Sequence, residues 1–283
     1  MSFTENFDRK KLQHILLFAM AAVVVAILVL LLIVFISTVS DNVSGASNFE
    51  LEGYTVTDKD ISSGPLILAD EDHPFQAGNE LVSTMVNCQE YRNANRQGDN
   101  GPYYTMNAVQ LSQIAMVAAH NLLTDAESAV QQDDLLIKYA YFATDGSTAE
   151  YNTGMLMYLT NYEEHELSAE YKSWVDENAV NYGFVKSFEY GYRYVGLPHA
   201  KYMTDKGVTL EEYISYLKKN TSPTDALTIK TADGNEFAVY YVSCRAGDEI
   251  KVPVQAVNTD GTTAYTYVIS GTNEGGVIVT VSK

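Results

Sequence analysis

Residues Ile15 to Ile36 form an apolar run that contains no charge, proline or glycine. As a helix, its 22 residues span about 33 Å, which is enough to cross the hydrocarbon core of a bilayer. No small-residue cleavage pattern ends the run, so it favours an uncleaved membrane anchor over a secretory signal peptide. Arg9, Lys10 and Lys11 precede the run. The positive-inside rule therefore predicts a cytoplasmic N-terminus and an extracellular remainder.

Helical periodicity returns further along the chain. Thr209 is a natural N-cap for a helix through Lys218, with two glutamates in its first turn. Ser168 to Tyr182 predicts a second helix, and Tyr103 to Leu123 predicts a third, amphipathic one. The apolar positions that indicate this third helix are Met106, Val109, Ile114, Val117, Ala118 and Leu122.

Strand patterns appear in two places. Residues 133–142 indicate a short buried strand. After Pro223 the chain alternates between apolar, β-branched segments and hairpin signals such as Asp233-Gly234 and Asp260-Gly261. Here we predict a small β-rich extension, with strands at 226–229, 236–242, 250–254, 264–269 and 276–281.

The charge balance is strongly acidic. The chain has 36 acidic and 18 basic residues, and the part beyond the apolar run keeps 34 acidic and 15 basic residues, a net charge of −19. Such a domain is unsuited to nucleic acid, and the simplest interpretation of its charge is solubility. Cys88 and Cys244 are the two cysteines. They lie in a potentially oxidising setting, and the sequence leaves open whether they pair.

Three segments carry a resemblance to a known family. Residues 64–74 read Gly-Pro-Leu-Ile-Leu-Ala-Asp-Glu-Asp-His-Pro, and residues 149–158 read Ala-Glu-Tyr-Asn-Thr-Gly-Met-Leu-Met-Tyr. Residues 192–200 read Tyr-Arg-Tyr-Val-Gly-Leu-Pro-His-Ala, followed at 207–213 by Gly-Val-Thr-Leu-Glu-Glu-Tyr. These segments resemble the VanY-type D-Ala-D-Ala carboxypeptidases, zinc enzymes of the cell wall. The second segment corresponds to the family's Ser-Glu-His-Gln-Thr-Gly-Leu-Ala-Val-Asp and the third to its Phe-Arg-Tyr-Val-Gly-x-Pro-His-Ala.

The resemblance breaks down where the family holds its metal. Tyr151 stands at the first zinc histidine, Tyr158 at the aspartate and Gly191 at the second histidine. Phe188 stands at the catalytic glutamate, and Phe142 at the arginine that holds the substrate carboxylate. Phenol is a poor zinc ligand at neutral pH, glycine has no side chain, and phenylalanine accepts no proton. By this alignment the catalytic residues and the zinc cofactor are absent.

The sequence contains one candidate for a replacement metal site and one for a binding surface. The cluster 163–166 (Glu-Glu-His-Glu) lacks the spacing that places two imidazoles on one helix face, so a charged loop is the favoured interpretation. Aromatic residues gather around the expected site instead. They indicate either a stacking surface for glycan or protein, or rings that refill a vacated cavity. The candidate binding surface comprises Tyr139, Tyr141, Tyr151, Tyr158, Tyr190, Tyr192 and Arg193.

We therefore expect an α+β fold with a single N-terminal transmembrane helix. The expected parts are a cytoplasmic tail (1–14), a transmembrane helix (15–37), an extracellular linker (38–63), a carboxypeptidase-like domain (64–222) and a β-rich extension (223–283). The first hypothesis for function is a pseudoenzyme of a Gram-positive cell membrane that binds or scaffolds peptidoglycan. The alternatives are an active metallo-D,D-carboxypeptidase with displaced ligands, and a structural subunit of an envelope complex with protein partners.

Overall fold

The computed structural model describes residues 45–46, 49–95, 101–142, 150–255 and 265–282, which all belong to one compact unit, Ser44–Lys283. The apolar run over 15–36, expected to be a membrane anchor, lies outside the described residues. Within the part of the chain that is described, no helix has both the length and the apolar character needed to span a bilayer.

A mixed five-stranded sheet, here called the first sheet, has the strand order β4-β6-β7-β9-β8. Only the β4–β6 pair is parallel. The helices α5 and α6 pack on one face of this sheet and bury the largest apolar cluster, the first core. The strands are β4 (Tyr104–Thr105), β6 (Leu135–Tyr139), β7 (Leu156–Asn161), β8 (Phe184–Phe188) and β9 (Gly191–Tyr194), and the helices are α5 (Gln113–Val130) and α6 (Ala169–Asn178).

The helix predicted from Tyr103 begins ten residues later, at Gln113. The residues before it form β4 and β5 (Gln110–Ser112), and the backbone turns between them through Ala108, whose φ of 64° is left-handed. β5 pairs with β3 (Met85–Asn87), so strand pairing replaces helical hydrogen bonds here. The predicted apolar face was also wrong in part, because the side chains buried along α5 are Ala115, Met116, Ala119, Leu122, Leu123 and Ala126.

Other local predictions are confirmed. The residues from 135 to 139 form the buried strand β6. Ser168 caps α6 by accepting a hydrogen bond from the Tyr171 amide, and a 3-10 helix, η2 (Ala179–Tyr182), continues it. Thr209 and Glu212 form a reciprocal capping box at the start of α8 (Leu210–Asn220).

The strands predicted after Pro223 are confirmed as well. Most of them form the second sheet, in the order β1-β10-β11-β14-β13. Its members are β1 (Gly45–Ala46), β10 (Asp225–Lys230), β11 (Glu236–Ser243), β13 (Thr266–Gly271) and β14 (Gly276–Ser282).

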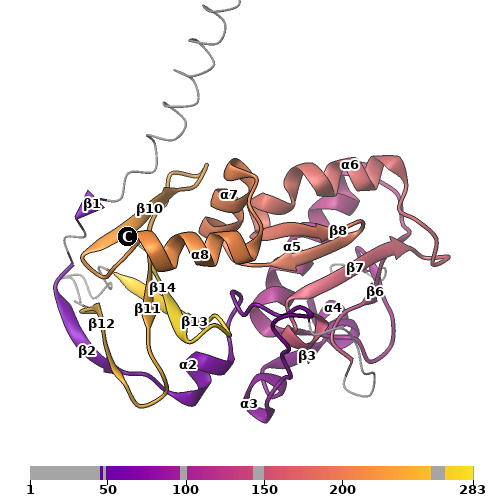
Figure 1. The fold of residues 1–283 in the computed structure, drawn as a ribbon. Coiled ribbons are helices and arrows are strands. Elements are labelled where there is room, and N and C mark those ends of the chain that lie inside the picture. Colours follow the sequence, from indigo (N-terminus) through magenta and orange to yellow (C-terminus); the bar gives the residue numbers. More distant parts are fainter. Residues whose placement is uncertain (1–44, 47–48, 96–100, 143–149, 256–264, 283) are drawn as a thin grey trace, which may run out of the picture. The chain divides into compact units, whose positions relative to one another are not determined.

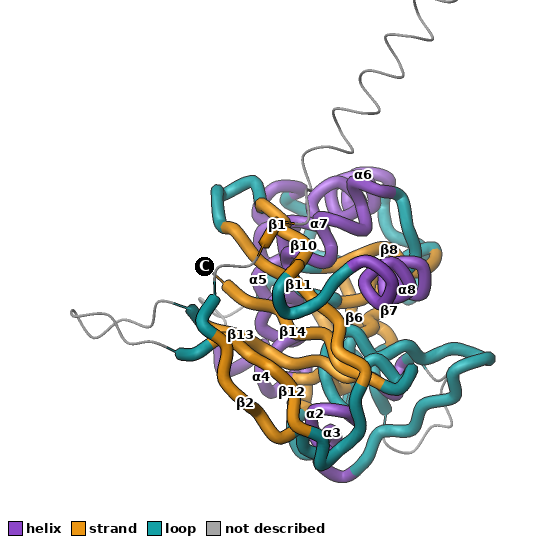
Figure 2. The backbone as a smooth tube through the Cα atoms, turned by 60° about the vertical axis from the view of Figure 1, so that its left-hand side comes forward, coloured by secondary structure: helices purple, strands orange, loops and turns teal. Residues whose placement is uncertain are grey.

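Residues 51–62, expected within a linker, are instead folded. They form the strand β2 (Leu51–Thr55) and the helix α2 (Asp58–Ser62), which Thr57 and Asp60 begin with a capping box. β2 pairs with β12 (Glu249–Pro253), and this two-stranded ribbon packs against the second sheet in a shared apolar cluster (Figure 2). Pairing with a strand about 200 residues away is what orders this polar segment.

The two sheets are joined by α7 (Leu197–Lys206) and α8, which lie between them (Figure 1). Apolar side chains of both helices share one cluster with β10, β11 and β14. Leu66 and Leu68, from the segment before the first sheet, enter the same cluster. The described residues also form two further short helices, α3 (Asn79–Val82) and α4 (Cys88–Asn95).

Candidate functional site

The positions expected to replace the zinc ligands lie together on the first sheet. Tyr158 on β7 and Gly191 on β9 are cross-strand partners, and Phe188 at the end of β8 also pairs with Gly191. Tyr151 begins the short 3-10 helix η1 (Tyr151–Thr153), which ends at the left-handed Gly154 just before β7. The fold thus gathers residues that sequence comparison alone had assigned to one site.

Gly191 leaves room for the ring of Phe188. A Cβ atom at position 191 would lie 2.6 Å from the Cε2 and Cζ atoms of that ring. This distance is much shorter than van der Waals contact between two carbon atoms, so the two groups would clash. The present packing of Phe188 therefore excludes an imidazole at the position where the family has its second histidine.

Tyr139, Tyr158 and Phe188 form a row of three rings, here called the aromatic row. The ring centroids of Tyr139 and Tyr158 are 5.9 Å apart, and those of Tyr158 and Phe188 are 6.1 Å apart with planes 21° from parallel. Tyr190 meets Tyr158 edge-on. The two ends of the row are open, since Tyr139 is 51% exposed and Phe188 is 41% exposed. The row therefore both fills the expected metal site and presents aromatic surface to solvent.

Three residues proposed for the binding surface are buried, and one of them is Tyr190, which is 9% exposed and belongs to the first core. Tyr192 is 0% exposed and belongs to the first core, where its hydroxyl donates to Oδ1 of Asp176 on α6 at 2.7 Å. Since side chains alternate across a strand, Tyr192 faces the helices, and its neighbours Gly191 and Arg193 face away from them. Arg193 is itself only 3% exposed. The prediction of a surface position is wrong for Tyr190, Tyr192 and Arg193, whereas Tyr141 and Tyr151 are half-buried.

The side chains at the expected zinc positions do not fit the metal. Burial, followed by the charge of Glu150, raises the pKa of Tyr151 to about 12, so its hydroxyl stays protonated at neutral pH. A protonated phenol is a poor partner for Zn²⁺, which prefers thiolate, imidazole and carboxylate. Among the described residues, no group of three or more His, Cys, Asp or Glu side chains is placed to hold a metal ion.

The acidic cluster at 163–166 forms an exposed turn after β7. His165 Nδ1 lies 3.7 Å from Glu163 Oε2, and both side chains are largely solvent-exposed. Glu164 points elsewhere and pairs with Lys138 on β6 at 3.2 Å. The interpretation of this segment as a charged loop agrees with these positions. Phe142, at the position of the family's substrate arginine, is half-buried and packs against the first core.

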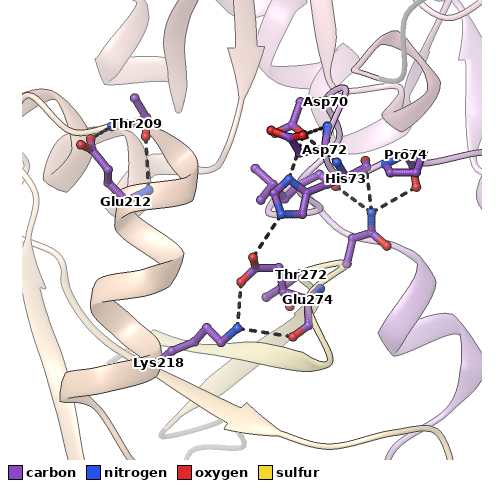
Figure 3. A network of polar contacts seen from close by, with 11 residues as sticks. Asp70, Asp72, His73, Pro74, Thr209, Glu212, Lys218, Thr272 and Glu274 are labelled. Carbon is purple, nitrogen blue, oxygen red and sulfur yellow. Dashed lines mark hydrogen bonds and ion pairs between the residues drawn. The ribbon is translucent and has the colours of Figure 1, made fainter.

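A polar network fixes the loop that follows Leu68 (Figure 3). His73 places Nδ1 2.8 Å from Asp70 Oδ1 and Nε2 3.2 Å from Glu274 Oε1. Glu274 also pairs with Lys218 of α8 at 2.8 Å. Hydrogen bonds from His73 lower the pKa of Asp70 in spite of partial burial, which acts the other way. The network holds Asp70 as a carboxylate between the first sheet and α8.

Cys88 and Cys244 are both free and buried. Cys88 lies in the first core and Cys244 in the cluster beneath the β2–β12 ribbon. Their thiols are not joined in this structure, and burial raises the pKa of both.

Comparisons with known proteins show which proteins this chain resembles. No family model matches the chain. A D-alanyl-D-alanine carboxypeptidase of Enterococcus faecium is 26% identical over 252 residues, which cover 80% of this chain and 78% of that protein. The solved structure of the D,D-dipeptidase VanXYg in complex with a D-Ala-D-Ala phosphinate analog matches with a TM-score of 0.60 at 18% identity, over 83% of this chain and 100% of that chain. VanYB in complex with D-alanine-D-alanine is 20% identical, with a TM-score of 0.37 over 53% of this chain and 97% of that one.

The mixed helix-and-strand fold resembles that of VanXYg. The sequence match to the enterococcal protein likewise supports the resemblance to the VanY-type D-Ala-D-Ala carboxypeptidases.

Proposed function

We propose that the chain is a non-catalytic member of its family that binds peptidoglycan from the outer face of a cell membrane. The observation that carries the proposal is the aromatic row, which occupies the place where a relative would hold zinc. Support for the location comes from the apolar run over 15–36 and from the positive charges before it.

The loss of catalysis is proposed from the chemistry that remains. Hydrolysis by a zinc peptidase needs a metal-bound water and a side chain that takes its proton. Phe188 replaces the proton acceptor, and Gly191 has no donor atom. Each missing group lowers activity by orders of magnitude, and here they are missing together.

Binding is proposed from the shape of the row. Flat aromatic rings are effective contact residues because they offer large apolar area with little loss of side-chain entropy. The exposed rings of Tyr139 and Phe188 flank the half-buried Tyr158. A sugar ring or an apolar peptide side chain of the wall polymer would stack across these two ends.

The first test measures zinc and turnover in the full-length chain purified in detergent. We expect substoichiometric zinc and no release of D-alanine from a pentapeptide stem. Stoichiometric zinc with turnover would show that the chain is an active enzyme with displaced ligands.

The second test measures retention on purified peptidoglycan sacculi. Tyr139→Ala and Phe188→Ala are each expected to weaken retention at least about tenfold, the cost of losing an aromatic contact worth about 1.4 kcal/mol. The matched control is Tyr162→Ala, because Tyr162 is an exposed tyrosine that contacts Tyr104 outside the row. If sacculi do not retain the unmodified chain, but membrane proteins co-purify with it, the envelope-subunit alternative is supported instead.

A further inference from the structure

A groove with a volume of about 790 Å³ lies where α5 meets β13 and the start of α7. Four of the eight large apolar side chains that are exposed among the described residues line it: Ile114 and Val117 of α5, Leu197 of α7 and Val268 of β13. Exposed apolar side chains scattered singly over a surface are ordinary, whereas a patch that gathers them marks a contact with another molecule or with a membrane. The groove is therefore a candidate contact surface.

The groove opens on the α5 side of the first sheet, and the aromatic row lies on the other face. Tyr194 lines the groove and packs against the first core, on the face that α5 covers. Tyr158 and its cross-strand partner Gly191 lie on the opposite face, since side chains alternate along β9 and Tyr192 points toward the helices. A molecule that covers the groove therefore leaves the aromatic row accessible.

The charge of the groove differs from that of the molecule. The chain beyond the apolar run has a net charge of −19, yet of the described residues that line the groove only Lys59 is charged and none is acidic. Beside it, the hydroxyl of the lining residue Tyr182 donates a hydrogen bond to Asp125. Anionic lipid headgroups repel an acidic surface, whereas a lysine can lie along an apolar surface while its ammonium reaches a lipid phosphate. The charge of this face therefore permits a contact with a bilayer that an acidic face would oppose.

The length of the chain before β1 limits how far the domain can lie from a membrane. Eight residues, 37–44, separate the apolar run at 15–36 from β1. Fully extended, they reach no more than about 30 Å. β1 and β13 are the two edge strands of the second sheet, four strand spacings apart, which is about 19 Å. The tether is thus longer than this sheet is wide, so the groove beside β13 can reach the bilayer that would hold the apolar run.

We propose that this face of the domain rests on the outer surface of the lipid bilayer. Its four exposed apolar side chains enter the interfacial region, and Lys59 reaches a lipid phosphate. Apolar side chains accompanied by a cation are typical of surfaces that lie in the membrane interface. Fluid lipid chains also fill a hollow face, whereas a rigid protein partner needs a ridge of matching shape. The inference rests on the membrane location in the proposed function, and it turns the aromatic row away from the membrane, toward the wall.

The test uses the full-length chain in vesicles of phosphatidylcholine and phosphatidylglycerol, labelled at one cysteine with an environment-sensitive fluorophore. Val268→Cys and Tyr162→Cys are matched sites, since Val268 is 60% exposed and Tyr162, outside the groove, is 61% exposed. The native thiols Cys88 and Cys244 are buried and stay unlabelled in the folded chain. With lipids that carry a nitroxide on the acyl chain, we expect at least about twofold stronger quenching at position 268 than at position 162.

Two charge variants test the surface itself. Val117→Glu places a carboxylate in the groove and should abolish the quenching at position 268. Met106→Glu, at an aliphatic side chain outside the groove, should keep the quenching, and the two sites are matched because Met106 is 39% and Val117 41% exposed. Equal quenching at positions 268 and 162, or quenching that survives Val117→Glu, would overturn the inference. So would a blue shift at position 268 without quenching, because it reports a protein partner such as a second copy of the chain.

Flotation with the vesicles and retention on sacculi, measured on the same preparations, separate this inference from the proposed function. If the chain floats with the vesicles but position 268 is not quenched, the inference fails and the membrane location stands. If the chain does not float, the membrane location fails and the inference fails with it. If position 268 is quenched but sacculi do not retain the chain, the bilayer contact stands and the proposed wall binding fails.

Discussion

Replacing Gly191 tests whether the aromatic row has closed the expected metal position. A Cβ atom there would lie 2.6 Å from the ring of Phe188, so Gly191→Ala must displace that ring. The atoms concerned lie at the far end of a side chain that is 41% exposed, so the ring can turn toward solvent, and the cost stays below the roughly 1–3 kcal/mol of overpacking in a closed core. We expect Gly191→Ala to lower the free energy of unfolding by less than about 1 kcal/mol, measured by urea denaturation.

The double variant Gly191→Ala with Phe188→Ala separates steric conflict from other effects. Removing the ring opens the space, so the two substitutions together should cost less than the sum of their separate costs. Strictly additive costs would mean that the ring and the new methyl group do not compete for the same volume.

At this residue scale the structure places Tyr158, Phe188 and Gly191 together. The motif alignment had assigned these three residues to one site, because each lies a fixed number of residues from a recognisable motif. It failed at Tyr192, although alternation along β9 already places Tyr192 on the face opposite Gly191. The pairing of Glu150 with Arg193 spans 43 positions, and nothing local in the sequence indicates it.

His199 ties three elements together and should make stability depend on pH. Its Nδ1 lies 2.9 Å from the Tyr213 hydroxyl of α8, and its Nε2 lies 2.9 Å from Thr280 Oγ1 of β14. Complete burial lowers the pKa of His199 to about 3. In the unfolded chain a histidine titrates at about 6.5. Between these two pH values the unfolded chain binds a proton that the folded chain does not.

Stability should therefore be full above about pH 6.5 and should fall as the pH is lowered toward 3, by about 1.4 kcal/mol per pH unit from this group. Carboxylates with lowered pKa values, such as Asp176, add to the loss in acid, so the comparison with a variant is what isolates His199. His199→Gln should show a shallower fall in denaturation measured from pH 7 to pH 4. His165→Gln, at an exposed histidine, should keep the original slope, and equal slopes in all three chains would contradict the assignment.

At the element scale, capping signals were the most reliable guide. Ser168 and Thr209 mark helix starts that the structure confirms, because their hydrogen bonds are local. The helix start predicted at Tyr103 was wrong. Met106 and Val109 have helical spacing, but the strands on either side of them, β4 and β5, pair with β6 and β3. The fold of residues 51–62 was missed for a related reason, since β2 is ordered by pairing with the distant β12. Long-range pairing leaves little trace in local periodicity.

At the scale of the whole molecule, the strands after Pro223 were predicted, but their partners were not. The second sheet does not bury its apolar face alone, because Leu227, Val239 and Ile278 share a cluster with α7 and α8. A pattern of strands indicates which residues are apolar without indicating which surface covers them. The first core and this cluster are connected through β8 and the segment that follows β9. Val185 of β8 packs against the cluster of the second sheet, and Val195, which follows β9, belongs to it.

This shared packing predicts that residues 45–282 unfold as one cooperative unit. Met116 in the first core and Ile278 in the second sheet are both fully buried, and truncation of either to alanine typically costs about 2–5 kcal/mol. We expect calorimetry of the full-length chain to show one transition for this unit, and both Met116→Ala and Ile278→Ala to lower its midpoint as a whole by several degrees. The contrasting result is two transitions, with Ile278→Ala lowering only one of them. That outcome would mean that the β-rich extension is an independent domain, and that the first sheet, which carries the aromatic row, is stable without it.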